Sequence, residues 1–257
     1  MNTANQNPGR GFCDIHHDTY PAIDSAIKSD LKGRTVFISG ASKGIGRSTA
    51  ISYAKAGATQ IAIAARSDLS DVEADMLKAA KAAGKPEPKV LKIKLDVQER
   101  SSVAAAAQAL KDTFGRLDVL INNAGYLFEF AKLLDGDEDA YWRTWEINYR
   151  GVYWVTIALL PLLIETADGL QTIVNVSSTG AHNLSDGASA YQASKNALLR
   201  FTEFICVDYA DKGILAFSIH PGGVATELAL QMPERLHQGK LKTFSLLLEH
   251  RVIRFKS

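Results

Sequence analysis

The sequence has little cysteine and no spacing that suggests a metal site. Only Cys13 and Cys206 are present in 257 residues, without a Cys-x-x-Cys pair or a cysteine/histidine cluster at metal-ligand spacing. This scarcity excludes a disulfide framework, and no metal site is predicted. The first thirty residues contain no apolar run typical of a signal peptide. We therefore expect a reducing, cytoplasmic location.

Excess charge and long apolar runs are also lacking. The 29 Lys and Arg nearly balance the 28 Asp and Glu, and the net charge of +1 argues against a dedicated nucleic-acid surface. The longest apolar stretch, 152–164, includes Pro161 and is shorter than the roughly 20 residues that a membrane span needs. We interpret it as a buried helix and expect no membrane contact. Hydrophobic residues make up 46% of the chain and charged residues 22%, so a folded core is expected.

Short apolar runs alternate with longer amphipathic segments from Arg34 onward. Strands alternating with helices pair in parallel through right-handed crossovers, which places helices on both faces of the sheet. The sequence therefore predicts one doubly wound α/β domain. The expected strands are 35–40, 61–66, 90–96, 117–124, 172–178 and 214–222, and the expected helices are 44–56, 68–83, 99–114, 138–166 and 190–211.

Three parts are expected along the chain: a leader over 1–32, a catalytic domain over 33–226 and a tail over 227–257. The leader lacks sustained periodicity and is rich in turn-forming residues. It contains His16 and His17, a pair that can mark a metal site. Because no third ligand stands at a suitable spacing, we interpret the leader as polar surface chain.

A glycine-rich turn follows the first expected strand, with the sequence Gly40-Ala-Ser-Lys-Gly44-Ile-Gly46. Glycines let the backbone approach a diphosphate closely, and the first N–H groups of the following helix attract its charge. The spacing differs from the commonest dinucleotide fingerprint, and the alternative is a plain turn. Two cations flank this place: Lys43 within the turn, and Arg66 after the second strand, where NADP-binding domains place an Arg. Together they favour NADP over NAD.

Tyr191 and Lys195 lie four residues apart in an expected helix and so share one face. A neighbouring ammonium favours the phenolate, so we expect a lowered pKa for Tyr191, suited to proton transfer during hydride transfer. Either Ser177 or Ser178, at the end of the fifth strand, faces this site, because adjacent strand residues point to opposite faces. Asn148 lies inside an expected helix, either as a backbone cap or in a functional role.

In this order along the chain, these residues resemble the short-chain dehydrogenase/reductase family. The resemblance rests on Ser39–Gly46, Asp96-Val97, Asn122–Gly125, Asn148, Ser177-Ser178, Tyr191–Lys195 and Pro221–Thr226. It implies a Rossmann-type domain with strand order 3-2-1-4-5-6. It also implies Ser178 as the catalytic serine, since the family's serine precedes the tyrosine by about 13 positions and 191 − 178 = 13. The implied catalytic residues are Asn148, Ser178, Tyr191 and Lys195.

The resemblance also implies a cofactor site along the carboxyl ends of the strands. Asp96 and Val97 would flank the adenine, and Lys195 would also hold the nicotinamide ribose. Ser39 stands where the family more often has Thr, which keeps the hydroxyl. The implied cofactor-binding residues are Gly40, Ser42, Lys43, Gly44, Ile45, Gly46, Arg66, Asp96, Val97, Asn123, Ala124, Gly125, Tyr191, Lys195, Pro221, Gly222, Val224 and Thr226.

The chain departs from the family after Thr226. The family continues through a helical segment over the substrate, another helix and a seventh strand, whereas this tail has only 257 − 226 = 31 residues and no clear strand pattern. It is a short helix, a substitute strand, or the product of a shifted reading frame or retained intron. A missing seventh strand would leave 214–219 as an exposed sheet edge.

Three hypotheses follow for the function. The first is an NADP(H)-dependent oxidoreductase that moves a hydride between nicotinamide and a carbonyl or secondary alcohol of a small organic substrate. The second is a catalytically silent dinucleotide-binding or scaffold protein with an incomplete substrate pocket. The third is a homodimer through helices 138–166 and 190–211 whose main role is assembly. We favour the enzyme, because all four catalytic residue types are present.

Overall fold

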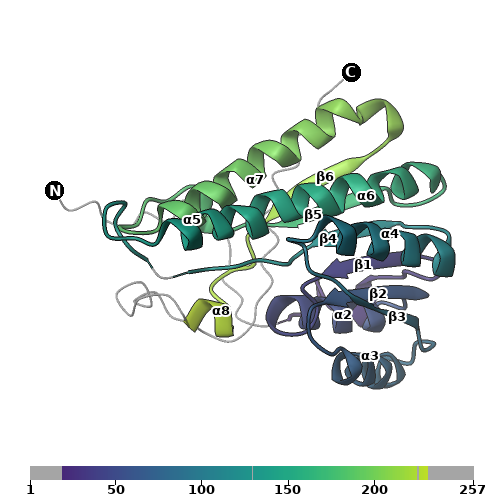
Figure 1. The fold of residues 1–257 in the computed structure, drawn as a ribbon. Coiled ribbons are helices and arrows are strands. Elements are labelled where there is room, and N and C mark those ends of the chain that lie inside the picture. Colours follow the sequence, from purple (N-terminus) through teal and green to yellow (C-terminus); the bar gives the residue numbers. More distant parts are fainter. Residues whose placement is uncertain (1–18, 129, 225, 231–257) are drawn as a thin grey trace.

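The computed structural model describes residues 19–128, 130–224 and 226–230 (Figure 1). Its centre is a six-stranded sheet in the order β3-β2-β1-β4-β5-β6, and every neighbouring pair is parallel. The predicted doubly wound fold and its strand order are confirmed. The strands are β1 Thr35–Ser39, β2 Gln60–Ala65, β3 Lys89–Lys94, β4 Val119–Asn122, β5 Thr172–Val176 and β6 Leu215–Ile219.

Helices cover both faces of this sheet, as the alternating pattern predicts (Figure 1). On one face α4, α6 and α7 pack against the strands, and on the other α2 and α3 do so. The helices are α1 Ser25–Lys28, α2 Gly44–Lys55, α3 Ser70–Ala82, α4 Arg100–Phe114, α5 Glu138–Trp145, α6 Val152–Glu165, α7 Ser189–Asp208 and α8 Glu227–Leu230.

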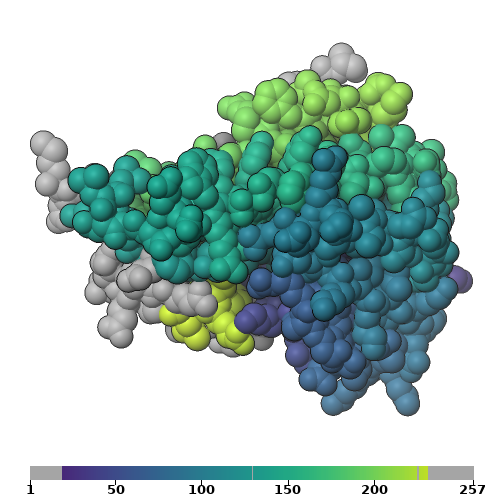
Figure 2. Space-filling view, in the orientation of Figure 1, coloured from purple at the N-terminus to yellow at the C-terminus, as the bar shows by residue number. Residues whose placement is uncertain are grey.

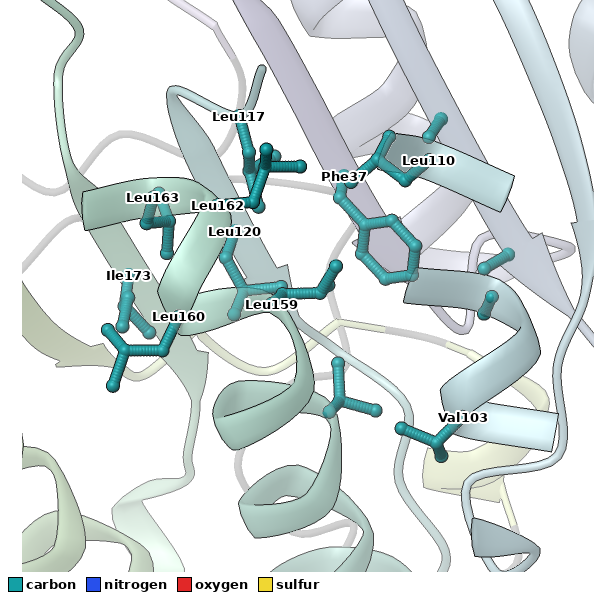
Figure 3. Packing of buried hydrophobic residues seen from close by; sticks show 14 of the residues in the cluster. Phe37, Val103, Leu110, Leu117, Leu120, Leu159, Leu160, Leu162, Leu163 and Ile173 are labelled. Atoms are coloured by element: carbon teal, nitrogen blue, oxygen red, sulfur yellow. The ribbon is translucent and has the colours of Figure 1, made fainter. Parts of the chain in front are cut away.

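Alternate residues of each strand belong to different cores. In β1, Phe37 packs with α4 and α6, whereas Val36 and Ile38 pack with α2 and α3. Figure 3 shows Phe37 between Leu110 of α4 and Leu159 of α6. Because side chains alternate across a pleated strand, a strand buried on both faces needs apolar residues at every position. This explains the continuous apolar runs in the sequence.

The expected helix 138–166 is not one regular helix. A π-helical turn, Glu146–Gly151, separates α5 from α6, and it contains Asn148. The spacing of apolar residues gives no sign of the extra residue that such a turn accommodates. Two further differences are small: four residues of the expected irregular leader form α1, and α7 ends at Asp208 with a 3₁₀ turn, Ala210–Lys212, behind it.

One helical stretch in the described residues, Glu138–Glu165, is long and apolar enough by composition to cross a membrane. More than half of its most apolar window, 56%, is buried inside the fold. Leu159 and Leu163 on its inner side belong to the core that includes α4 and the sheet. The stretch therefore packs as a core helix. The tail after residue 230, in which no seventh strand was predicted with a clear pattern, lies outside the described residues; within them β6 is a sheet edge.

Asp118 forms a buried ionic cluster at the opposite end of the sheet from the predicted site. Its fully buried carboxylate accepts hydrogen bonds from Arg34 at 3.0 Å, from Arg116 at 3.0 Å and from the backbone N–H of Thr35 at 2.8 Å. Burial alone would raise the pKa of Asp118, but the hydrogen bonds from Arg116 and Thr35 outweigh it and hold the pKa below its usual value. This cluster ties the start of β4 to β1.

Replacing Asp118 with alanine is expected to lower the free energy of unfolding at pH 7 by about 2–4 kcal/mol, because two guanidinium groups and a backbone donor lose their acceptor. The folded-state pKa is lowered, so the stabilisation is complete above about pH 4 and is lost as the pH falls through the folded pKa. Urea titrations at pH 7 and at pH 3 check this. A wild-type advantage that stays constant between the two pH values would contradict it.

Candidate active site

The predicted site residues converge at the carboxyl ends of the central strands. The glycine turn follows β1, Asn123 to Gly125 follow β4, Ser178 follows β5, and Pro221 follows β6. The order of strands reverses between β1 and β4, and open α/β sheets bind ligands at such a switch point. The fold therefore brings segments that are far apart in sequence to one edge.

Close packing explains the glycines in the turn after β1. Gly40 has φ +66°, and a Cβ there would lie 2.8 Å from Cα of Ala124. A Cβ on Gly46 would lie 2.2 Å from the carbonyl oxygen of Gly40. Side chains at either place would push the turn away from β4 or from α2. The glycines thus keep the first turn of α2, with its unpaired backbone N–H groups, against the sheet edge.

Ser39 and Asn123 hold this turn against the end of β4. The Ser39 hydroxyl accepts from the backbone N–H groups of Asn123 and Ala124, at 3.1 and 3.2 Å. In return, the side-chain amide of Asn123 donates to the carbonyls of Ser39 at 3.1 Å and Gly40 at 3.0 Å. Serine therefore supplies the hydroxyl that this position needs. The side-chain amide of Asn123 is bonded to the turn, which leaves its backbone for the cofactor contact that the resemblance implies.

Tyr191 and Ser178 meet across the site. Tyr191 lies in the first turn of α7 and forms a hydrogen bond with the Ser178 hydroxyl, which itself accepts from the backbone N–H of Gly180 at 3.0 Å. Burial raises the pKa of the Tyr191 phenol, and the Ser178 hydrogen bond lowers it by less. The expected lowering of the Tyr191 pKa by Lys195 is wrong, because desolvation dominates and the Lys195 ammonium lies 5.9 Å from the ring centroid.

Lys195 is buried beneath the site with most of its hydrogen-bonding capacity unused. Only 4% of the residue is exposed, and burial lowers its pKa to about 8. An ammonium has three donors, and among the described residues the only acceptor of Lys195 Nζ is the carbonyl of Val176, at 2.8 Å. A Cβ on Gly125 would lie 3.7 Å from this Nζ, so small residues border it. The hydroxyls of a cofactor ribose fit these unused donors.

The two serines after β5 have different roles in the structure. Ser177 is buried, and its hydroxyl donates to the carbonyl of Lys195 at 3.1 Å. Ser178 points the other way, toward Tyr191. This is the division that strand alternation predicts, and it places Ser178 rather than Ser177 beside the phenol.

Asn148 is fully buried in the π-helical turn and connects three elements. Its side-chain oxygen accepts from the backbone N–H of Tyr126 at 2.8 Å. Its side-chain nitrogen donates to the Tyr126 carbonyl at 2.9 Å and to the Ser194 hydroxyl at 3.2 Å. The backbone cap is therefore present. The same oxygen lies 3.5 Å from the position of a Cβ on Gly125, next to the Lys195 ammonium, so Asn148 also borders the site.

Sequence reasoning missed Ser194, Gln192 and Asn196. Ser194 links Asn148 to the carbonyl of Tyr191, to which it donates at 2.8 Å. Gln192 bonds both the backbone and the hydroxyl of Ser185, and Asn196 donates to the Ala181 carbonyl at 2.9 Å. These side chains fix the segment 179–188 to α7. Polar residues adjacent to Tyr191 and Lys195 were the available signal, but their partners are in another segment.

A cavity of about 510 Å³ opens beside this segment. It lies between 131–133, 180–187 and one side of α7, and its polar lining includes Lys132, His182 and Gln192. Its size suits a small organic molecule. Residues 131–133 and 180–187 thus line an open cavity beside α7.

The nucleotide end of the site is more open. Arg66 follows β2 directly and is exposed, and within the described residues it makes no ion pair. Asp96 accepts from the backbone N–H of Gln98 at 3.0 Å. Val97 is turned inward, since a Cβ on Gly151 would lie 2.8 Å from its methyl group. Its contact with adenine stays a prediction.

The segment after β6 returns to the glycine turn. Gly222 has φ +84°, Val224 is buried, and the Thr226 methyl group lies 3.1 Å from the position of a Cβ on Gly44. Lys43 forms an ion pair with Glu227. Within the described ranges, no group of three His, Cys, Asp or Glu residues is placed to hold a metal ion.

Comparisons with known sequences agree with this geometry. The family model for short chain dehydrogenases matches residues 34–236. The short chain dehydrogenase mpl6 of Monascus purpureus is 52% identical to this chain over 230 residues, which cover 88% of this chain and 78% of that protein.

Solved structures show the same fold with two different cofactors. The NADH-dependent reductase A1-R′ complexed with NAD has a TM-score of 0.67 and 27% identity, covering 74% of this chain and 78% of that one. The alcohol dehydrogenase of the archaeon Thermococcus sibiricus complexed with 5-hydroxy-NADP has a TM-score of 0.65 and 27% identity, covering 78% and 80%. With its sheet order, glycine turn and Ser178–Tyr191–Lys195 arrangement, this chain belongs to the short chain dehydrogenase family, oxidoreductases that bind a nicotinamide dinucleotide.

Proposed function

We propose that this protein transfers a hydride between NADP(H) and a carbonyl or secondary alcohol of a small organic substrate. The observation that carries the proposal is the meeting of Tyr191 with the Ser178 hydroxyl at the sheet edge, above the buried ammonium of Lys195. When bound, the dinucleotide supplies or accepts the hydride at its nicotinamide ring. The chain's own residues must then transfer one proton to or from the substrate oxygen and orient that oxygen.

Each of the four residues has a proposed part in this work. Ser178 donates a hydrogen bond that orients the substrate oxygen, and Tyr191 gives that oxygen a proton during reduction or takes it during oxidation. Lys195 holds the ribose hydroxyls with its unused donors. Asn148, held by Tyr126 and Ser194, keeps a polar atom beside Lys195 through which a water could be positioned.

The protonated form of Tyr191 suits the reductive direction. A phenol ordinarily carries its proton at neutral pH, and burial, which raises the pKa of Tyr191, strengthens this preference. A protonated phenol is the form that a developing alkoxide needs from a general acid. Oxidation would first require loss of that proton, which the nearby ammonium of Lys195 assists once it is charged.

The charges at the nucleotide end support NADP. The solved relatives carry either NAD or NADP, so the choice depends on this chain's own side chains. A bound 2′-phosphate would meet the guanidinium of Arg66 after β2 and the ammonium of Lys43 in the glycine turn. Ala65 and Arg66 at the end of β2 supply no carboxylate for a ribose 2′-hydroxyl.

Replacing Arg66 with glutamine is expected to weaken NADPH binding about tenfold or more and to leave NADH binding within about twofold, because only NADPH loses a charge-assisted hydrogen bond. Isothermal titration with both nucleotides measures the ratio of the dissociation constants. Arg200→Gln, an exposed arginine on α7, is the matched control. An unchanged ratio in Arg66→Gln would remove the NADP preference.

The homodimer through 138–166 and 190–211 stays a prediction. Both helices carry exposed apolar side chains that a second copy would cover: Tyr153 and Ile157 on α6, and Phe204 and Val207 on α7.

A further inference from the structure

Lys43 and Glu227 form an ion pair between two segments that lie far apart in the sequence. Lys43 is the last residue before α2, and Glu227 is the first residue of α8, 184 positions later. Both side chains are largely exposed, at 68% and 69%. The Glu227 carboxylate is therefore paired with the Lys43 ammonium, which a bound nucleotide would also contact.

A second contact holds the same two segments together. The Thr226 methyl group lies 3.1 Å from where a Cβ on Gly44 would stand. The Thr226 hydroxyl accepts from the backbone N–H of Ala229 at 3.1 Å, which fixes the start of α8. Figure 2 shows the yellow α8 segment beside the purple N-terminal part of the fold. Segment 226–230 thus rests on the glycine turn, with its carboxylate directed at the turn's one lysine.

The other cations of this region are arranged differently. Arg47, in the first turn of α2, is already bonded to Asp75 of α3 through two nitrogens, at 2.6 and 3.2 Å. Arg66 has no ion pair within the described residues. A 2′-phosphate can therefore bind Arg66 directly, whereas it must displace Glu227 to bind Lys43.

We infer that Glu227 is a specificity-determining residue, whose carboxylate competes with the 2′-phosphate of NADP(H) for Lys43. The inference rests on the proposed use of NADP(H). A 2′-phosphate carries more negative charge than a carboxylate and repels Glu227 when both are near Lys43. Binding of NADP(H) therefore separates Glu227 from the glycine turn. A nucleotide without the 2′-phosphate leaves the ion pair intact, so Glu227 narrows the preference for NADP(H) over NAD(H).

Replacing Glu227 with glutamine in the full chain tests this by calorimetry. We expect NADPH and adenosine 2′,5′-bisphosphate to bind about three- to tenfold more tightly, because competition and repulsion are both removed at an exposed site. NADH and AMP should bind within about twofold of wild type. The gain should shrink at high ionic strength, since exposed charges are screened.

Two further variants isolate the cause. Glu165→Gln is the matched control, because Glu165 makes an exposed ion pair with Lys111 near the far end of α6 and should change neither affinity. In the Lys43→Gln background, Glu227→Gln should lose most of its gain, since the competition needs the ammonium. Equal tightening of NADPH and NADH, no tightening at all, or a full gain without Lys43 would each overturn the inference.

The same titrations separate this inference from the proposed function. If Lys43→Gln and Arg66→Gln leave the ratio of NADPH to NADH affinity unchanged, the proposed NADP preference fails and the inference fails with it. If those variants lower the ratio while Glu227→Gln does nothing, the function stands and only the role of Glu227 is overturned.

Discussion

Replacing Tyr191 with phenylalanine is expected to lower kcat for carbonyl reduction by about 10²–10⁴-fold, the range that a general acid contributes. The variant keeps the ring and removes only the hydroxyl that bonds Ser178. The developing alkoxide then has no positioned proton donor. NADPH affinity should fall at most about tenfold, because a single neutral hydrogen bond is lost. Single-turnover kinetics with NADPH and a panel of ketones separates the two effects.

Tyr149→Phe is the matched control for this experiment. Tyr149 lies in the π-helical turn and contacts Trp145 and Phe201 through its ring. The Tyr149→Phe variant should keep the wild-type kcat. A Tyr191→Phe enzyme that retains more than about a tenth of wild-type kcat would refute the role of the phenol. NADPH binding with no turnover in the wild type, on every carbonyl tested, would favour the silent binding protein instead.

The pH dependence of the wild-type enzyme follows from the same group. The pKa of Tyr191 is raised, so the protonated phenol persists through neutral pH, and the rate of reduction should fall only when alkaline pH removes the proton. Oxidation should show the opposite trend and rise with pH. Burial sets this direction, and burial is a property of the packed fold that the four-residue spacing of Tyr191 and Lys195 does not reveal.

The fold was predictable because its signals are local. Each strand is a continuous apolar run, and each helix between strands has its own periodicity, so the alternation alone predicts a parallel sheet. The glycine turn and the Tyr191–Lys195 pair are also local patterns. Ser178 was harder, since strand alternation left two serines, and only the family spacing chose between them before the structure placed Ser178 beside Tyr191.

The remaining features depend on contacts between distant segments. The π-helical turn that sets Asn148 beside Tyr126 leaves no trace in the apolar pattern. The ion pair of Lys43 with Glu227 joins residues 184 positions apart, and no periodicity predicts such a pair. Electrostatic expectations from sequence thus fail where folding supplies an additional partner or removes water.

Lys195→Met is expected to remove part of the pH dependence of stability and to lower the activity of the enzyme. The pKa of Lys195 is lowered by burial from 10.5 to about 8. Between these two values the unfolded chain binds a proton that the folded chain does not, so the free energy of unfolding must rise with pH across this window. The expected rise is on the order of 2–3 kcal/mol. Methionine has similar length and no titrating group, so the variant should lack this rise.

The same substitution should lower the activity of the enzyme. Without the ammonium, the ribose hydroxyls lose their donors and the phenol loses the nearby charge, so kcat/KM should fall by at least about a hundredfold. Saturating NADPH should also flatten the wild-type pH dependence, because bound hydroxyls stabilise the charged amine. Urea titrations from pH 7 to pH 10.5 with both proteins provide the test. Parallel curves for wild type and variant would mean that Lys195 is not desolvated in the free protein. The urea titrations and the kcat/KM values together distinguish two roles for the buried lysine. A lysine that serves the cofactor lowers the stability of the free protein near neutral pH, and a lysine that serves the fold does not.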